Sequence, residues 1–447
     1  MEEMRCALLL SLVFNAAAAM SARAAIPVYG WGSGTTGGDG KPICTVTTLA
    51  DSSSTVPPGS LREILTGANG NTCCTSSNGC RVVFGGLSGD LGLFGDLDVH
   101  QSNVTIDGST AAAHGIQLFG WSLNLFGSNI IVTQIRHRGN SYGTGDHAAL
   151  KNNIDILCGV GVVLDHVSLE WSNYKNLGIA GYDCDKLNLP YPRNITVQNS
   201  ILAQSLISLD TLVDGDVAQL TFYHNLIGGD SGRHPQITTG HHGIQQGAAS
   251  APQSGTGHYE ALNNVITSYN YGMQIKSYSD GWTVLFDAVG NVFQAGPNGN
   301  NKTPILIRDD NQVGQDPPLL GTVSVYAHDN QMTTGALHAA NCVSASPDQY
   351  SHCDCDAVSS ILVNQNCSVS TTLTNHMVRA TSPQGSHNAT EAAAATMAIV
   401  LRNAGATLPC RDSVDAQIVN AVASGAGLKF ITAPPSARPD ETQACPP

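Results

Sequence analysis

The chain has 447 residues, of which 42% are hydrophobic and only 12% are charged, and its formal net charge is −14 at pH 7. This length and apolar content allow a large core, and the acidic balance argues against nucleic acid as a partner. Beyond the N-terminus, no apolar run is long enough to span a membrane, so we expect neither a nucleic acid nor a membrane partner.

The N-terminus has the pattern of a secretory signal peptide. Arg5 precedes a short apolar run that ends in the small-residue sequence Ala22-Arg23-Ala24. We therefore expect residues 1–25 to be removed and the mature protein to be secreted and extracellular. Sequons for N-glycosylation suit this route and occur at Asn103, Asn194, Asn301, Asn366 and Asn388.

The cysteines agree with an oxidising compartment. Of the 13 cysteines, only Cys6 lies in the expected signal peptide, which leaves an even number in the mature chain. Such a number in a secreted protein favours disulfides over metal sites. Two clusters, one from Cys73 to Cys80 and one from Cys342 to Cys367, lie in polar stretches, so we expect them to tie loops together.

One short pattern recurs along the chain, an alternating hydrophobic segment that ends near an asparagine. It occurs at residues 103–108, 129–132, 161–166, 194–199, 219–225, 258–264, 285–291 and 324–330. The spacing corresponds to a coil of about 25 residues with loop insertions, which is typical of a stacked array. Strands without long intervening helices predict an all-β solenoid, a right-handed parallel β-helix.

The asparagines at the ends of these segments have a structural interpretation. Asparagine tolerates left-handed backbone and can bond its own backbone at a turn, so we expect Asn199, Asn225, Asn264 and Asn291 to occupy turns.

The C-terminal part is expected to complete the same domain rather than to form a second one. Residues 26–331 contain the β-helix, and residues 332–447 contain a disulfide-tied extension followed by helices. Apolar periodicity predicts helices over 391–403 and 412–422, both docked on the coils.

Three separated segments, in the right order, resemble the pectate lyase superfamily, in particular the group close to polysaccharide lyase family one. Residues 30–64 resemble the N-terminal segment of that group, in which a capping helix precedes the coils, and Ser60 suits its N-cap. Residues 164–171 resemble the Asp-His-x-Ser-Leu-Ser-Trp strand, and residues 400–416 resemble the helical closing segment. The resemblance implies a lyase that acts on an acidic polysaccharide such as pectate or pectin.

The resemblance also implies a catalytic base. In these lyases, an arginine in an Arg-x-Pro sequence after a His-Asn strand removes the C5 proton of a uronate, and the C4–O4 bond breaks by β-elimination. Arg233 before His234-Pro235 matches that position. An arginine has a free pKa above about 12, so it acts as a base only where desolvation and neighbouring positive charge favour its neutral form.

The chain departs from the family pattern at the calcium site. Pectate lyases usually hold calcium through carboxylates on neighbouring coils, but these positions fall on Asn152, Tyr174, Lys175 and Gly178. One amide oxygen is a poor replacement for several carboxylates. The sequence therefore establishes no cofactor, although a shifted calcium site stays open, with Asn152, Asp146 and Asp155 as the nearby candidates.

Lys175 has two interpretations. Its ammonium can take the place of calcium, pair with the substrate carboxylate and stabilise the developing anion without metal. Alternatively, it is a solvated turn lysine, and the chain is an inactive protein of lyase shape that binds glycan.

Other cationic groups can line a substrate groove. Those that follow repeat strands or adjoin Arg233 are Arg136, Arg138, His224, His234 and Lys276. The alternative for Arg136 and Arg138 is that they only solvate an edge of a coil.

A glycoside hydrolase on the same fold is the other enzyme to consider. Hydrolysis needs two carboxyl groups at a defined separation. Asp214, Asp216, Asp309 and Asp310 supply acids outside the recognised repeat positions, and we expect them to be loop residues. The sequence thus favours a secreted monomer that cleaves an acidic polysaccharide as a lyase.

Overall fold

The computed structural model describes residues 25–139, 151–181, 184–239, 255–277, 282–294, 296–298, 303–307, 322–333, 376–378 and 390–433. Within these ranges, the longest helices have only 11 residues, and no helix has the length and apolarity to cross a membrane. The expected signal peptide, Asp146, Asp309, Asp310, the second cysteine cluster and three of the sequons lie outside the described residues.

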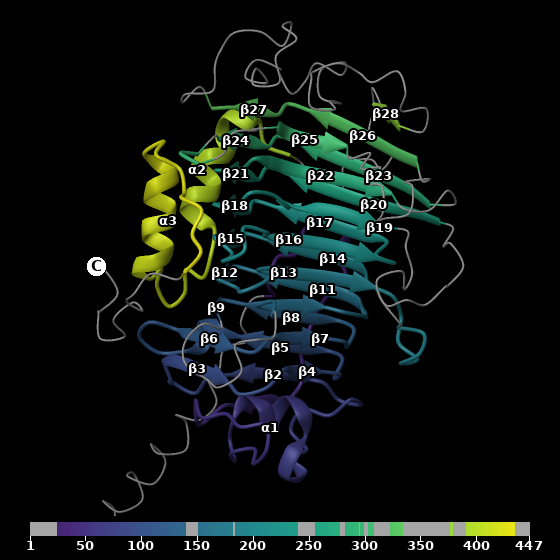
Figure 1. The fold of residues 1–447 in the computed structure, drawn as a ribbon. Helices are drawn as coiled ribbons and strands as arrows, with labels where there is room; N and C mark the ends of the chain where they lie inside the picture. Colours follow the sequence, from purple (N-terminus) through teal and green to yellow (C-terminus); the bar gives the residue numbers. More distant parts are fainter. Residues whose placement is uncertain are drawn as a thin grey trace, which may run out of the picture.

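The described chain winds into a right-handed parallel β-helix with three sheets (Figure 1). The 11-stranded sheet contains β1 (Ile43–Thr45), β2 (Cys80–Val83), β5 (Val104–Asp107), β8 (Ile130–Thr133), β11 (Val160–Asp165), β14 (Arg193–Gln198), β17 (Gln219–Tyr223), β20 (Gly255–Leu262), β23 (Trp282–Val289), β26 (Thr322–His328) and β28 (His376–Val378). All eight recurring segments of the sequence lie in this sheet, in chain order, which confirms the predicted fold.

Each coil continues through two further sheets. The 9-stranded sheet contains β3 (Gly89–Leu93), β6 (Ile116–Gly120), β9 (Ile135–Arg138), β12 (Ser168–Glu170), β15 (Ile201–Ala203), β18 (Leu226–Gly228), β21 (Val265–Thr267), β24 (Val292–Gln294) and β27 (Gln331–Met332). The 8-stranded sheet contains β4 (Leu97–Val99), β7 (Leu123–Leu125), β10 (Ile154–Ile156), β13 (Leu177–Gly181), β16 (Thr211–Gly215), β19 (Gln236–Thr239), β22 (Tyr271–Ser277) and β25 (Thr303–Ile307).

The core is built from inward-facing residues that stack in register from coil to coil. One buried row of the 11-stranded sheet contains Val104, Ile130, Val162, Ile195, Leu220, Tyr259, Phe286 and Val325. Because side chains alternate between the two faces of a strand, one register keeps this row inside along the whole stack.

The strand-end asparagines stack instead of adopting the expected left-handed turn. The side-chain amide of Asn225 donates to Asn264 Oδ1 at 3.0 Å, Asn264 donates in turn to Asn291 at 3.0 Å, and Asn291 donates to Asn330 at 2.9 Å. The left-handed residue is the one before each asparagine, for example His224 with φ 55°. Only Asn199, with φ 49°, has the expected backbone. The other three lie at turns between strands, as expected, but the expected left-handed backbone was wrong for them, because a buried amide must find partners and the next coil supplies them.

The first end of the stack is closed as the sequence predicts. Helix α1 (Leu61–Thr66) contacts β4, and the Ser60 hydroxyl caps it by accepting the Glu63 N–H at 3.1 Å. The Glu63 carboxylate accepts the N–H of Gly59, the residue before the N-cap, at 2.6 Å, which holds the chain where it enters the helix. Disulfides Cys44–Cys73 and Cys74–Cys80 tie the same region, and Cys158–Cys184 ties a loop further along.

The short 3-10 helices are η1 (Gly30–Gly32), η2 (Ala68–Gly70) and η3 (Gly108–Thr110).

Helices α2 (Ala393–Asn403) and α3 (Ser413–Ala423) lie against the 9-stranded sheet, as Figure 1 shows. This confirms both predicted helices and their docking. Their buried apolar residues form a second core with outward-facing residues of that sheet; the members include Trp171, Ile201, Leu226, Val265, Val292, Val400, Ile418 and Val422.

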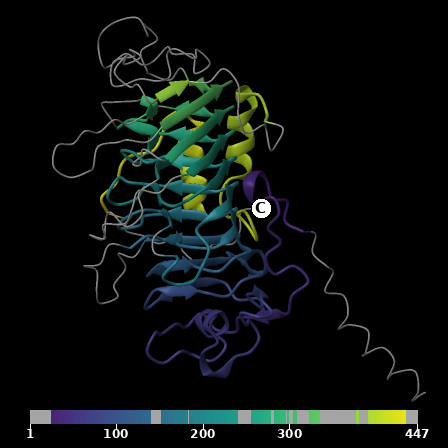
Figure 2. The same cartoon turned by 90° about the vertical axis from the view of Figure 1, so that its right-hand side faces the viewer.

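The N-terminal segment covers the 11-stranded sheet. The backbone N–H groups of Trp31, Gly32 and Gly38 donate to the hydroxyls of Thr221, Thr196 and Thr105 at 3.0, 2.9 and 2.8 Å. This approach is close: a Cβ on Gly38 would lie 2.0 Å from the carbonyl oxygen of Cys80. Figure 2 shows the purple N-terminal segment running along the stack. Among the described elements, neither this segment nor the C-terminal helices pack on the 8-stranded sheet, although every residue of its strands β16 and β19 is buried, and we therefore look for the candidate site along this sheet.

Candidate active site

The turns that enter the 8-stranded sheet stack on one another from coil to coil. The Asn153 N–H donates to the Lys175 carbonyl at 3.2 Å, and the Asn176 N–H donates to the Asp210 carbonyl at 3.0 Å. The Thr211 N–H then donates to the Arg233 carbonyl at 2.8 Å. These bonds fix the order of the turns and bring residues far apart in sequence to one edge of the sheet.

Lys175 and Arg233 share this edge. Lys175 leads into β13 and Arg233 leads into β19, with the coil of β16 between them. Since neighbouring strands lie about 4.8 Å apart, the two backbones are roughly 10 Å apart. Arg233 has left-handed backbone, with φ 72°, which is unusual for a long side chain and is found mainly where surrounding structure enforces it.

Lys175 is a buried cation. Its side chain is 7% exposed, and its ammonium lies 3.6 Å from the centroid of the Tyr174 ring. Burial lowers the pKa of Lys175; the Arg233 charge lowers it further, whereas Tyr174 and Asp155 raise it. A solvated turn lysine would not be enclosed in this way, so that interpretation was wrong.

The positions that resemble calcium ligands do not provide a calcium site. The Asn152 side chain accepts the Lys175 N–H at 3.1 Å and donates to Asp155 Oδ1 at 2.6 Å, so both ends of its amide are used. Gly178 has no side chain to contribute, and a Cβ there would lie 2.0 Å from Asp155 Oδ1. Among the described residues at these positions, Asp155 is the one carboxylate, and Lys175 adds a positive charge that would repel a cation.

Asp155 lies in the same group of residues as Asn152, Lys175 and Gly178. It lies on β10, next to Gly178 in register, and it is partly exposed. Burial raises the pKa of Asp155 to about 6, an effect that Asn152 and Lys175 partly offset.

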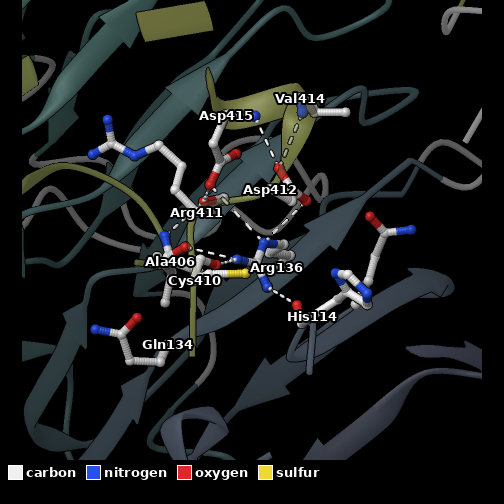
Figure 3. A network of polar contacts seen from close by, with 12 residues as sticks. His114, Gln134, Arg136, Ala406, Cys410, Arg411, Asp412, Val414 and Asp415 are labelled. Carbon is white, nitrogen blue, oxygen red and sulfur yellow. Dashed lines mark hydrogen bonds and ion pairs between the residues drawn. The ribbon is translucent and has the colours of Figure 1, made fainter. Parts of the chain in front are cut away.

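Arg136 and Arg138 are structural and do not line a substrate groove, which corrects that prediction. Both are 1% exposed on β9, beneath the C-terminal segment. Figure 3 shows Arg136 between His114, Ala406 and Asp412; its guanidinium donates to the first two carbonyls at 2.7 Å and lies 3.1 Å from Asp412.

Arg138 is enclosed by carboxylates. Its Nε lies 2.8 Å from Glu170, and its other nitrogens pair with Asp412 and Asp415. Burial alone would lower the pKa of Arg138, but these three carboxylates outweigh it and raise the pKa above its usual range. The 9-stranded sheet faces the C-terminal helices, so arginines on its outer face dock α3 and cannot reach the 8-stranded sheet.

The two predicted histidines are also buried. His224 is 7% exposed at the turn from β17 to β18, and its Nε2 lies 3.0 Å from Glu391 ahead of α2. His234 is 0% exposed, and its Nδ1 lies 2.9 Å from the Tyr271 carbonyl oxygen. His234 is fully enclosed, and His224 lies at the turn into the 9-stranded sheet and not along the 8-stranded sheet, so neither lines the proposed groove and these predictions were wrong. The backbone of Lys276 lies in β22 of the 8-stranded sheet, paired with Thr238, and its role in substrate binding stays a prediction.

The acids considered for hydrolysis do not form an open pair. Asp214 lies within β16 and Asp216 follows it, and both are buried. Asp214 is therefore a strand residue, not the expected loop residue.

A buried group beneath Arg233 could not be recognised from the sequence. The side chains of Asp210, Asp230 and His234 meet in the turns before β16 and β19, with their candidate ligand atoms within 4.8 Å of one another. Burial raises the pKa of Asp210 to about 8, and burial with the nearby Asp210 charge raises that of Asp230. Burial lowers the pKa of His234 to about 4. The signal in the sequence was weak, because these residues occupy turns of two different coils.

Comparisons with known proteins agree with this architecture. No protein-family model matches the chain. A curated relative from Emericella nidulans, named probable pectate lyase C, is 29% identical over 278 residues, which are 60% of this chain and 52% of the relative. A relative of the same name from Aspergillus terreus is 26% identical over 302 residues, which are 66% of this chain and 60% of the relative. The chain thus spans a little more than half the length of these relatives.

Solved structures share the fold at low sequence identity. The cedar pollen allergen jun a 1 has a TM-score of 0.51 and 18% identity, over 85% of this chain and 92% of the allergen. A pectate lyase bound to a hexasaccharide has a TM-score of 0.52 and 14% identity, over 87% of this chain and 99% of that lyase. The sequence relatives and the shared parallel β-helix thus support the resemblance of this chain to the pectate lyase superfamily.

Proposed function

We propose that this protein is a secreted polysaccharide lyase that cleaves a uronate-containing polysaccharide of the pectate type by β-elimination, with Arg233 as the base. The observation that carries the proposal is the position of Lys175 and Arg233 at one edge of the 8-stranded sheet. The names of the sequence relatives, and the hexasaccharide bound to a lyase of similar fold, support the substrate class.

In the proposed reaction, the neutral guanidine of Arg233 removes the proton from C5 of a uronate. The electron pair of that C–H bond forms a C4–C5 double bond while the C4–O4 bond breaks. The departing O4 becomes a hydroxyl by taking a proton from solvent. Because two cations close together favour the loss of a proton from one of them, Lys175 supports the basic form of its neighbour.

Lys175 has a second role in this mechanism. As C5 loses its proton, negative charge spreads onto the substrate carboxylate, and a fixed ammonium stabilises that charge. The Tyr174 ring at 3.6 Å limits the movement of the ammonium, so little reorganisation is needed during the reaction. We propose that this ammonium takes the place of the calcium ion, because Asn152 and Gly178 offer no free carboxylate.

The predicted signal peptide and the disulfides support action outside the cell. We also propose that the protein acts as a monomer, with no nucleic acid or membrane partner.

The test is an assay of the purified full chain on polygalacturonate and pectin, with and without a chelator. Ultraviolet absorbance of an unsaturated uronide is expected to rise in both conditions. Release of reducing sugar without this absorbance would favour a hydrolase instead. Retention on a polygalacturonate column with neither signal would favour a glycan-binding protein that has lost catalysis.

A further inference from the structure

Asp210, Asp230 and His234 form a buried group of potential metal ligands behind the turn that carries Arg233. All three are 0% exposed, and one ligand atom from each lies within 4.8 Å of the others. Asp210 precedes β16, whereas Asp230 and His234 precede β19 on the next coil. The group therefore joins two consecutive coils, and it is separate from the residues that resemble calcium ligands.

The hydrogen bond of His234 fixes which of its nitrogens faces the group. A carbonyl oxygen only accepts, so the contact of 2.9 Å with the Tyr271 carbonyl requires a proton on Nδ1. In the neutral imidazole, Nε2 then carries a lone pair. Nε2 is buried and has no hydrogen-bond partner within the described part of the chain. A carbonyl that holds Nδ1 in this way is the usual support for a histidine that binds metal through Nε2.

The carboxylates also direct lone pairs into the same space. Asp210 Oδ1 accepts the Thr211 hydroxyl at 3.2 Å, but its Oδ2 is buried and has no hydrogen bond to any described residue. Asp230 faces Ser205 and Gln204 of the preceding coil, which only partly offset its burial. Several electron-pair donors thus converge in a space closed to solvent, which is costly without a cation or protons between them.

The donor types indicate which cation would fit. One imidazole nitrogen with two carboxylates suits a first-row divalent ion, whereas calcium prefers a larger set of oxygens. Zinc bonds to these donors are about 2.0–2.2 Å long, so donors on opposite sides of the ion lie at most about 4.4 Å apart. The candidate ligand atoms of Asp210, Asp230 and His234 lie up to 4.8 Å from one another, so they need to move only slightly closer together to bind one ion.

We propose that Asp210, Asp230 and His234 bind one zinc ion that joins the coils of β16 and β19 beneath Arg233. The ion is structural, since it is closed off from the outer face where a polysaccharide would lie. It fixes the turn in which Arg233 adopts left-handed backbone. The inference rests on the geometry of this group and does not depend on lyase activity.

The test is metal analysis of the full chain, purified without an affinity metal and exchanged into chelator-treated buffer. We expect about one zinc ion per wild-type chain. His234→Gln and Asp230→Asn are expected to lose the zinc, whereas His100→Gln, which changes an exposed histidine, is expected to keep it. Wild-type protein stripped under mild denaturation should regain its Tm with added zinc but not with calcium.

Two measurements keep the proposal testable if the variants fail to fold. X-ray absorption of the wild-type protein is expected to show one imidazole nitrogen with oxygen ligands and no sulfur, and sulfur or purely oxygen coordination would overturn the site. A wild-type chain without zinc whose Tm does not respond to added zinc would also overturn it. In that case, a proton shared by Asp210 and Asp230 would explain the group.

Discussion

Lys175 and Arg233 lie two coils apart along one edge of the 8-stranded sheet. The charge of Arg233 adds to burial in lowering the pKa of Lys175. Two cations held near each other favour the binding of an anion between them or the loss of a proton from one of them. In the proposed reaction, a uronate substrate would meet both conditions, because its carboxylate would pair with one group and its C5 proton would be transferred to the other.

Arg233→Ala is expected to lower kcat/KM on polygalacturonate by roughly 10²–10⁴-fold, the usual contribution of a general base. The measurement is the initial rate of absorbance increase, with Tm as a check on folding. Arg402→Ala, which changes an exposed arginine at the end of α2, is the matched control and should keep the wild-type rate. Wild-type activity in Arg233→Ala would eliminate this residue as the base.

Lys175→Ala is expected to lower kcat by about 10²–10³-fold, because removing one group that stabilises the developing anion has that effect. Wild-type activity should be unchanged by EDTA, because in the proposed mechanism the Lys175 ammonium stabilises the substrate carboxylate in place of a calcium ion. The control is Lys429→Ala, which changes an exposed lysine. If EDTA abolishes activity and calcium restores it, the metal-free mechanism is wrong.

The stability of the protein should depend on pH through Asp155. Its pKa of about 6 is raised above the ordinary carboxyl value, mainly by burial, so the folded protein holds this proton more tightly than the unfolded chain does. The contribution of Asp155 to the free energy of unfolding is therefore largest below about pH 4 and declines as the pH rises through 6. Asp155→Asn should flatten that part of the profile.

The check is urea unfolding of wild-type protein and Asp155→Asn across this pH range. Asp185→Asn, at an exposed aspartate, serves as the control. Identical profiles for Asp155→Asn and wild type would show that the carboxyl of Asp155 does not titrate in this window.

Arg138→Ala is expected to destabilise the protein by about 3–5 kcal/mol, because it leaves buried carboxylates without their cation. Urea unfolding measures the loss, and proteolysis should cut the C-terminal helices faster. Arg402→Ala should be neutral in both measurements. If Arg138→Ala left stability unchanged but weakened retention on polygalacturonate, Arg138 would be a substrate-binding residue and not a structural one.

Asn264→Ala is expected to lower stability by about 1–3 kcal/mol for each buried group it leaves without a partner, and it removes contacts to both Asn225 and Asn291. The change in urea midpoint measures this, with Asn78→Ala at an exposed turn as the control. A shift no larger than that of the control would mean that the asparagine stack contributes nothing to stability.

Much of the fold could be predicted from the sequence because its signals are local. The recurring strands, the Ser60 cap of α1 and the amphipathic patterns of α2 and α3 all depend on residues close in the chain. The site was predicted only in part. Lys175 and Arg233 could be proposed from the sequence because each adjoins a recognisable strand, and their roles stay predictions.

The cations that were assigned incorrectly show why the rest could not be predicted. Arg136 and Arg138 follow a strand as Lys175 does, and nothing near them in sequence shows that Asp412 and Asp415 cover them. His234 follows Arg233 directly, yet its side chain points inward to Asp210 and Asp230.

By itself, the sequence determined the repeating strand, its register and hence the β-helix, since alternation along a strand decides which side chains face the core. Only the tertiary structure decided which sheets the N-terminal segment and the C-terminal helices cover. The physical reason is that the N-terminal segment and the C-terminal helices cover two sheets through contacts between residues more than 100 positions apart, such as Gly32 with Thr196 and Arg138 with Asp415. Those contacts turn some cations that a strand pattern would place at the surface into buried structural groups, whereas Lys175 and Arg233 lie along the sheet on which neither of these two described segments packs.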